Sequence, residues 1–201
     1  PVSKWLRESN SKIKPVVEAL ISLPLVLPPT VLGFYLLIAF SPNNAFGTWL
    51  EQTLGLQLIF SFPGLVLASV LYSFPFMVQP IQAGLSNLPL NMKESSYVLN
   101  KGKWETLFRV LLPNIKPSIL TALVITFAHT IGEFGVVLMI GGNIPGVTKV
   151  ASIAIYDEVE SLNYAAAHQY ALILLLLTFS ILIAVYTLNK KLNLTGNYAQ
   201  G

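Results

Sequence analysis

A set of polar side chains lies along one side of the apolar stretch 117–140. Ser118, Thr126, His129, Thr130 and Glu133 fall within about 120° when successive residues are placed about 100° apart around a helix. If this stretch crosses a membrane, its carboxylate costs about 2.5 to 3.5 kcal/mol to insert and is expected to face water or a protein interior. These five residues are therefore candidates for a polar translocation pathway. The alternative for Glu133 is a structural carboxylate near the outer interface.

His129 and Glu133 are four residues apart, a spacing that metal-binding helices use, but the rest of a metal site is missing. The HExxH zinc motif needs a second histidine and a third ligand, and this chain has only one other histidine, His168, and no cysteine. The segment 141–148, GGNIPGVT, begins like a phosphate-binding loop, yet Val147 stands at the lysine position, so we expect a turn-rich loop. No metal, cofactor, nucleotide or catalytic site is predicted. The chain is not expected to be an enzyme, and any energy that it uses must come from an ion gradient or another subunit.

The composition indicates an all-α polytopic membrane protein. Of its 201 residues 10% are charged, compared with about 25% in soluble domains, and the mean hydropathy is +0.66. A membrane-spanning helix needs roughly 20 apolar residues, and four stretches qualify: 16–40, 58–85, 117–140 and 168–188. We expect one transmembrane domain over 1–201. The polar start does not read as a signal peptide, and because the chain begins with Pro1, we expect at least one helix before it.

Basic residues are distributed asymmetrically around these stretches. Eleven of the twelve Lys and Arg residues lie before the first stretch, between the second and third, or after the fourth. Cytoplasmic loops carry such an excess, which places both termini and the connector 91–114 in the cytoplasm. The net charge of +3 gives no reason to expect nucleic acid as a partner.

The first two stretches contain more interruptions than a simple membrane anchor needs. Internal prolines break helices, and such breaks are tolerated at membrane depth where protein or a water-lined cavity satisfies the backbone. Ordinary kinks are the alternative, but the number of interruptions favours a polar passage. They are Pro24, Pro28, Pro29 and Thr30 in the first stretch and Ser61, Pro63, Gly64, Pro75 and Pro80 in the second.

The connector 91–114 has the pattern of two short amphipathic helices. Tyr97, Trp104, Leu107 or Phe108, and Leu111 recur at helical spacing and predict one apolar stripe. The segment 100–102, Asn-Lys-Gly, predicts a tight turn because Asn and Gly tolerate the left-handed backbone. From these features alone, the connector could also be an interfacial helix that lies on anionic lipid.

The connector also resembles the cytoplasmic loop of ABC-transporter permeases, whose pattern is EAA, three residues, Gly, nine residues, Ile-x-Leu-Pro. Glu94, Leu112 and Pro113 agree outright, Val110 agrees in kind, two serines replace the two alanines, and Asn100 replaces the glycine. The resemblance implies a coupling loop that docks on an ATP-hydrolysing subunit. The docking residues that it implies are Glu94, Ser95, Ser96, Asn100, Gly102, Leu112 and Pro113.

Three longer segments resemble the permeases of bacterial molybdate importers. They are LPLVLPPTVLGFYLL (23–37), FPGLVLASVLYSFPFMVQPIQAGL (62–85) and AHTIGEFGVVLMIGGNIPGVTK (128–149). The GEF and NIP elements also occur in related sulfate permeases. The resemblance implies a type I ABC importer permease in the bacterial inner membrane that carries molybdate, or tungstate, by alternating access. It also implies a homodimer, two ATPase subunits and an extracytoplasmic molybdate-binding protein as partners. A sulfate or thiosulfate permease is the main alternative, and a gradient-driven secondary transporter is a further one.

Overall fold

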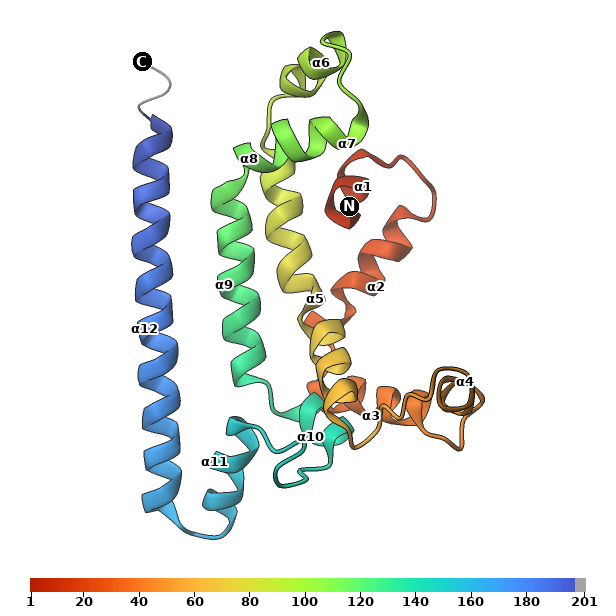
Figure 1. Ribbon diagram of the computed structural model, residues 1–201, viewed down its shortest axis with the longest axis vertical. Coiled ribbons are helices and arrows are strands. Elements are labelled where there is room, and N and C mark those ends of the chain that lie inside the picture. Colours follow the sequence, from red (N-terminus) through yellow and green to blue (C-terminus); the bar gives the residue numbers. More distant parts are fainter. Residues whose placement is uncertain (198–201) are drawn as a thin grey trace. The chain divides into compact units, whose positions relative to one another are not determined.

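The structure is a computed structural model that describes residues 1–197, with side chains described as far as Thr187 (Figure 1). Within this range the chain consists of helices and loops, without strands. The helices are α1 (Val2–Glu8), α2 (Lys14–Val26), α3 (Pro29–Phe40), α4 (Ala45–Leu54), α5 (Phe62–Ser86), α6 (Leu90–Val98), α7 (Lys103–Glu105), the π-helical turn η1 (Thr106–Leu111), α8 (Leu112–Asn114), α9 (Lys116–Gly132), α10 (Gly135–Gly141), α11 (Ala151–Glu160) and α12 (Tyr164–Asn197).

Among the described residues, two helices are individually long and apolar enough to cross a membrane. They are α5, with 25 residues, and the Tyr164–Thr187 part of α12, with 24 residues. Two further spans result if each of two bent pairs is counted as one, namely α2 with α3, bent by 115°, and Lys103–Asn114 with α9, bent by 78°. The helices therefore allow up to four spans.

The bend between α2 and α3 lies at the two adjacent prolines Pro28 and Pro29. Neither proline has an N–H group to donate, and a residue before proline is pushed out of the helical region. Pro28 accordingly has φ −54° and ψ 137°, and α3 begins at Pro29. The stretch 117–140 is also divided, because α9 ends at Gly132 and α10 begins at Gly135. Both breaks expose backbone groups near the residues that line the pocket described below.

The helices form two compact units, and four helices contribute to both. Unit 1 consists of residues 1–19, 76–126 and the described residues from 182 onward, and unit 2 consists of residues 20–75 and 127–181. The core of unit 1 is formed by Leu85, Leu107, Leu111 and Ile115. The main core of unit 2 contains Phe40, Leu50, Leu58, Ala68, Tyr72, Val136 and Ile140.

In unit 2, α10 packs closely on α3. A Cβ atom at Gly33 would lie 2.8 Å from the Met139 Cβ and 3.1 Å from the Val136 Cα, so only glycine allows this approach. Val136 and Ile140 are fully buried in the same contact. The close packing fixes the start of α10 next to the start of α3.

In unit 1, polar contacts attach α1 to α5, to the segment that follows α5 and to α6 of the connector. The Ser3 hydroxyl donates to the Val78 carbonyl (3.3 Å), and Arg7 donates to the Leu88 carbonyl (3.2 Å). Glu8 pairs with Lys93 of α6 at 2.7 Å. These contacts hold α6 in place from its N-terminal side.

Candidate docking loop and translocation pocket

The coupling loop, residues 91–114, folds as the two helical segments and the turn that its sequence predicts. Asn100 has φ +56°, in the left-handed region. The Asn100 N–H group donates to the Tyr97 carbonyl (2.9 Å), and the Lys101 N–H group donates to the Ser96 carbonyl (3.0 Å). These two bonds form the Schellman arrangement that commonly ends a helix. Asn100 therefore adopts the conformation for which glycine is the usual residue.

A buried pair of hydroxyl groups joins the two halves of the coupling loop. Ser96 and Thr106 are 4% and 0% exposed, and their side-chain oxygens lie 2.9 Å apart. The Ser96 hydroxyl donates to the Lys93 carbonyl at 2.8 Å. Because a serine hydroxyl has one proton to donate, Thr106 is the donor in the Ser96–Thr106 bond. Ser96, which stands where the ABC-permease pattern has alanine, thus accepts a hydrogen bond from Thr106.

The single apolar stripe expected along the loop is wrong. Leu107 and Leu111 are buried in the core of unit 1, whereas Trp104 and Phe108 are 63% and 59% exposed and stack on each other with ring centroids 6.1 Å apart. The physical reason is that residues 106–111 form a π-helix. Its i→i+5 bonding shifts each side chain away from the position that an α-helical period predicts.

Charges on the second half of the loop are paired with one another. Glu105 accepts from Lys101 (2.7 Å) and from Arg109 (2.9 Å), and the hydrogen bond from Lys101, followed by the charges of both basic residues, lowers the pKa of Glu105. Exposed pairs of this kind contribute little to stability. The exposed side chains of the first half of the loop form a separate surface.

That surface lies on α6 and at the turn after it. Of the docking residues predicted from the sequence, Glu94, Ser95, Asn100, Gly102 and Pro113 are exposed, Leu112 is half-buried and Ser96 is buried. Val98 and Leu99, which sequence reasoning did not single out, are 86% and 72% exposed beside them. Exposed apolar side chains that lie together indicate a surface for a partner.

A separate cavity of about 450 Å³ lies within unit 2. It is lined by the start of α3, by α5, by the end of α9 and by the segment that leads into α10. Of the predicted pathway residues, His129 and Glu133 line this cavity. The Thr130 hydroxyl forms a 2.9 Å hydrogen bond with that of Ser73. The lining residues are Pro29, Thr30, Tyr72, Ala128, His129, Gly132, Glu133, Phe134 and Gly135.

Glu133 is the acidic group of this cavity. Its side chain is 4% exposed, and no hydrogen bond of ordinary geometry reaches either carboxylate oxygen. The Ser69 hydroxyl of α5 lies within hydrogen-bonding reach of the carboxylate. The backbone carbonyl of Glu133 is held separately, because it accepts a 2.6 Å hydrogen bond from Ser152 of α11. The backbone at this position is thus fixed, while the carboxylate oxygens are left for another group.

The other polar groups of the cavity are neutral donors. They include the Thr30 and Tyr72 hydroxyls and the His129 ring, which packs on the Tyr72 ring with centroids 4.8 Å apart. The described lining contains no Lys or Arg. Neutral hydrogen-bond donors suit transient contact with an anion, whereas a buried cation would hold it.

Ser118 and Thr126 are not part of this cavity. Both belong to unit 1, and Ser118 packs against α5 so closely that its Cβ lies 2.6 Å from where a Cβ at Gly84 would be. The polar residues predicted to share one side of the stretch 117–140 are therefore distributed over both units. The structure brings together His129, Thr130 and Glu133 but not the first two residues of the set.

Sequence reasoning missed the polar residues of α5 beside the cavity. Ser69, Tyr72 and Ser73 are all buried, and they lie at positions i, i+3 and i+4 of an otherwise apolar helix. This spacing puts them on one face of the helix. The pattern was present in the sequence but was less conspicuous than the prolines that flank it.

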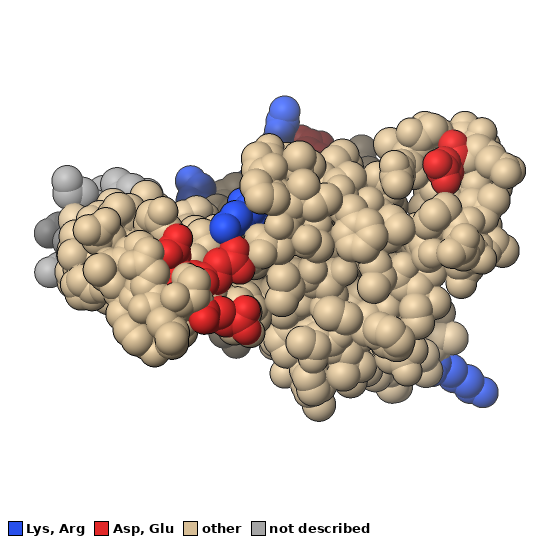
Figure 2. Space-filling model, turned by 90° about the horizontal axis from the view of Figure 1, so that it is seen from below, with Lys and Arg blue, Asp and Glu red and all other residues tan. Residues whose placement is uncertain are grey.

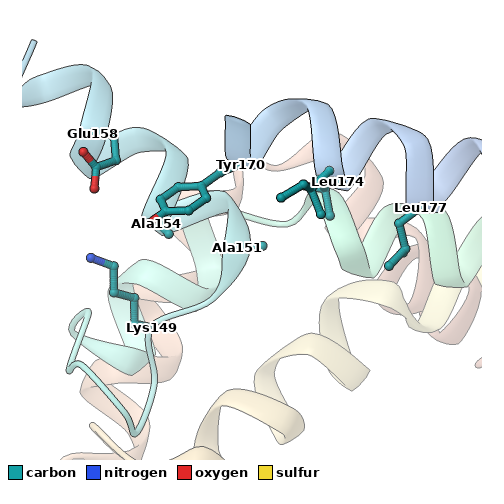
Figure 3. A pocket seen from close by; sticks show the side chains of 8 residues that line it. Lys149, Ala151, Ala154, Glu158, Tyr170, Leu174 and Leu177 are labelled. Atoms are coloured by element: carbon teal, nitrogen blue, oxygen red, sulfur yellow. The ribbon is translucent and has the colours of Figure 1, made fainter. Parts of the chain in front are cut away.

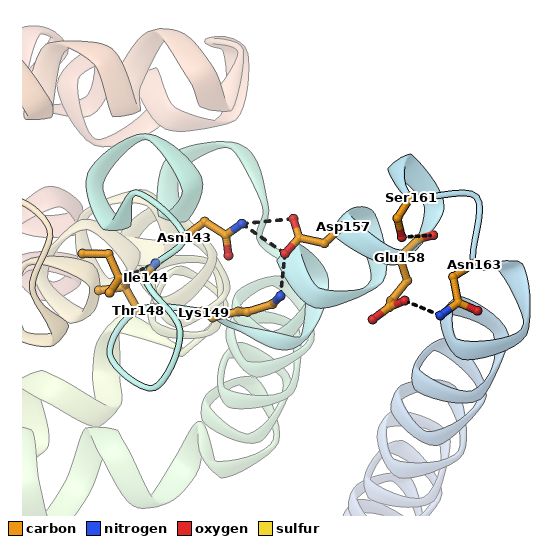
Figure 4. Close-up of polar contacts among 8 residues, drawn as sticks. All are labelled: Asn143, Ile144, Thr148, Lys149, Asp157, Glu158, Ser161 and Asn163. Carbon is orange, nitrogen blue, oxygen red and sulfur yellow. Dashed lines mark hydrogen bonds and ion pairs between the residues drawn. The ribbon is translucent and has the colours of Figure 1, made fainter.

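The loop 142–150 is closed by its own hydrogen bonds, as expected for a turn-rich loop. The Thr148 hydroxyl donates to the Gly141 carbonyl (2.6 Å) and accepts from the Ile144 N–H group (2.9 Å). Asp157 of α11 accepts two bonds from Asn143 (3.0 and 3.1 Å) and pairs with Lys149 at 2.5 Å (Figure 4). The hydrogen bond from Lys149, followed by that from Asn143, lowers the pKa of Asp157.

A charged surface and a second cavity lie close to this network. Helix α11 carries three acidic residues, Asp157, Glu158 and Glu160, and Figure 2 shows acidic side chains gathered beside basic ones on a face that is otherwise largely uncharged. A cavity of about 360 Å³ lies between α11 and α12, with Lys149, Glu158 and Tyr170 at one end and Leu174 and Leu177 further along α12 (Figure 3).

Comparison with known proteins identifies the family. The family model described as "Binding-protein-dependent transport system inner membrane component" matches residues 3–194. The chain belongs to this family. The permease is therefore a multi-pass membrane subunit of a transport system, in agreement with its apolar helices.

Individual relatives extend over most of the permease. The molybdenum transport system permease protein ModB of Azotobacter vinelandii is 47% identical over 93% of this chain and 83% of its own length. ModB of Escherichia coli K12 is 34% identical over 74% of this chain and 65% of its own length. The sulfate transport system permease protein CysT of the same strain is 30% identical over 88% of this chain and 63% of its own length.

A solved structure confirms the expected fold. A bacterial ABC transporter involved in the import of the acidic polysaccharide alginate superposes with a TM-score of 0.77, covering 94% of this chain and 70% of that chain, at 17% identity. At this identity the likeness shows the fold alone. The all-α ABC importer permease fold predicted from the sequence is confirmed.

Proposed function

We propose that this permease imports molybdate across the bacterial inner membrane as the homodimeric membrane component of an ATP-driven transporter. The observation that carries the proposal is the 47% identity to a molybdenum permease over 93% of the chain. The sulfate permease relatives are more distant, at 30% and 31% identity. Tungstate is expected to share the pathway, because the two tetrahedral dianions are nearly equal in size and charge.

The cavity in unit 2 is proposed to form part of the passage. Its neutral donors, the Thr30 and Tyr72 hydroxyls and the His129 ring, can bond the oxygens of a tetrahedral oxyanion without a permanent positive charge. In an alternating-access cycle such a site binds the substrate and then releases it. The absence of Lys and Arg from the described lining agrees with passage rather than storage.

The coupling loop is proposed to dock on one of two cytoplasmic ATPase subunits. Glu94, Ser95, Val98 and Leu99 are exposed on and beside α6, and the Ser96–Thr106 bond and α1 hold this helix in place. The positive-inside distribution supports the cytoplasmic position of this loop and of both termini. The side chains of Lys190 and Lys191, which contribute to that distribution, lie outside the described residues. The permease itself is proposed to have no catalytic site.

The remaining partner is proposed to be an extracytoplasmic molybdate-binding protein, and the description of the family as binding-protein-dependent supports a partner of this kind. It is expected to meet the two loops that carry few basic residues, 41–57 and 141–167. The acidic residues of α11 and the loop 142–150, which the Asp157 network makes rigid, belong to those loops.

Co-purification tests the docking proposal. The variant Glu94→Arg is expected to lose its ATPase subunit during affinity purification, because it reverses a charge on the docking surface. Glu51→Arg is a matched control, since Glu51 is exposed on α4, in a connector assigned to the other side of the membrane. Retention of the ATPase by Glu94→Arg, or equal loss in both variants, would contradict the proposed docking surface.

Competition tests the substrate. Uptake of labelled molybdate by the complete transporter is expected to be inhibited by excess tungstate and much less by excess sulfate. A stronger inhibition by sulfate would instead favour the sulfate permease alternative.

A further inference from the structure

The protonation state of the Glu133 carboxyl group determines whether the cavity in unit 2 can bind an anion. The group is buried and lines the cavity, and apart from the nearby Ser69 hydroxyl neither of its oxygens has a hydrogen-bond partner among the described residues. A polar group buried in this way is costly unless it binds something. The arrangement therefore points to a partner that is present only for part of the transport cycle.

An ionised carboxylate is a poor partner for the substrate class proposed above. Oxyanion and carboxylate would repel each other, and at short range this repulsion is strong in a site of low dielectric constant. The described lining offers no Lys or Arg to offset it. The titratable side chains that face the cavity are Tyr72 from α5 and His129 from α9, whereas α3 and the segment leading into α10 contribute none besides Glu133.

A protonated carboxyl group has the opposite effect, because it becomes a hydrogen-bond donor. We propose that Glu133 meets the passing oxyanion as a neutral carboxylic acid and donates its O–H group to an oxygen of the anion. When it is ionised, Glu133 closes the cavity to anions by repulsion. The proton stays on Glu133 while the anion passes, so transport of the anion does not consume it. This inference rests on the proposed oxyanion transport and assigns Glu133 a role within it.

The variant Glu133→Gln separates this role from a structural one. Glutamine has nearly the same shape and keeps a donor, but it cannot ionise. The experiment uses the complete transporter in proteoliposomes and measures initial rates of molybdate uptake between about pH 6 and pH 8. The wild type is expected to slow several-fold as the pH rises, relative to Glu133→Gln, whose rate stays high. Glu133→Ala, which has neither donor nor charge, is expected to be slow at every pH.

Each result has a distinct meaning. Equal pH profiles for the wild type and Glu133→Gln would overturn the inference while leaving molybdate transport intact. A Glu133→Gln variant that assembles with its ATPase but transports at no pH would also overturn it, because the negative charge would then be required. Absence of molybdate uptake by the wild type would instead overturn the proposed function.

A second measurement does not depend on any variant. Infrared difference spectra of the wild-type transporter, recorded with and without molybdate at neutral pH, are expected to show the carbonyl band of a protonated carboxylic acid that shifts when molybdate binds. The inference fails if only carboxylate bands change.

Discussion

Removing the Ser96 hydroxyl is expected to destabilise the coupling loop, and the loss of stability depends on whether its hydrogen-bond partner Thr106 is still present. In the variant Ser96→Ala the buried Thr106 hydroxyl loses its acceptor. A buried donor without a partner costs about 1 to 3 kcal/mol, whereas removing both members of a pair is nearly neutral. Ser96→Ala alone should therefore destabilise α6 more than the double variant Ser96→Ala/Thr106→Val does.

Hydrogen exchange in the assembled transporter measures this difference directly. A loss of about 1 to 3 kcal/mol corresponds to about 5- to 150-fold faster exchange of the α6 amides. The double variant is expected to exchange at close to the wild-type rate. Equal exchange in the single and double variants would refute the reasoning, and so would an unchanged rate in Ser96→Ala, since Thr106 would then have found another acceptor.

Three further predictions concern the turn, the helix contact in unit 1 and the α11 network. Asn100→Gly should keep ATP-coupled uptake, whereas Asn100→Val should reduce it. The reason is that a branched residue in the left-handed region that Asn100 occupies costs about 1 to 2 kcal/mol. Equal uptake by the two variants would contradict this prediction. Gly84→Ala should lower the melting temperature by overpacking against Ser118, at a cost of about 1 to 3 kcal/mol. The control variant Gly132→Ala would place its Cβ in open space and should leave the melting temperature unchanged. Equal shifts of the melting temperature in the two variants would argue against close packing at Gly84. The pKa of Asp157 is lower in the folded protein, so its contribution to stability is present above the unfolded pKa of about 4 and is lost as the pH falls through the folded value. Exchange of the α11 amides, corrected for intrinsic rates, should be constant between about pH 8 and pH 5 and rise in stronger acid, and Asp157→Asn should remove that rise.

Local features were predicted well where one residue type dictates the backbone. The Pro28–Pro29 pair ends one helix and starts the next, and Asn100 forms the left-handed turn. Both outcomes follow from the covalent structure of the residues concerned. The expected interruptions at Pro24, Pro75 and Pro80 are wrong, because these prolines lie inside the continuous helices α2 and α5.

Features that depend on packing were predicted less well. The stripe over 97–111 failed because the π-helix of residues 106–111 changed the period. The polar sector on 117–140 was divided because Ser118 packs against Gly84, a contact with a residue 34 positions away in the sequence. Ser69 and Ser73 were overlooked because a buried serine in an apolar helix is informative only once its partner is known. The partner of Ser73 is Thr130, and Ser69 lies beside Glu133.

The claim that this permease imports an oxyanion with energy from a partner ATPase is tested most directly by uptake into proteoliposomes. The vesicles contain the permease and its ATPase, with binding protein and labelled molybdate outside. Uptake is expected to require ATP inside the vesicles and to persist when ionophores abolish the proton and sodium gradients. Uptake that proceeds without ATP and stops when the gradients are abolished would contradict the account.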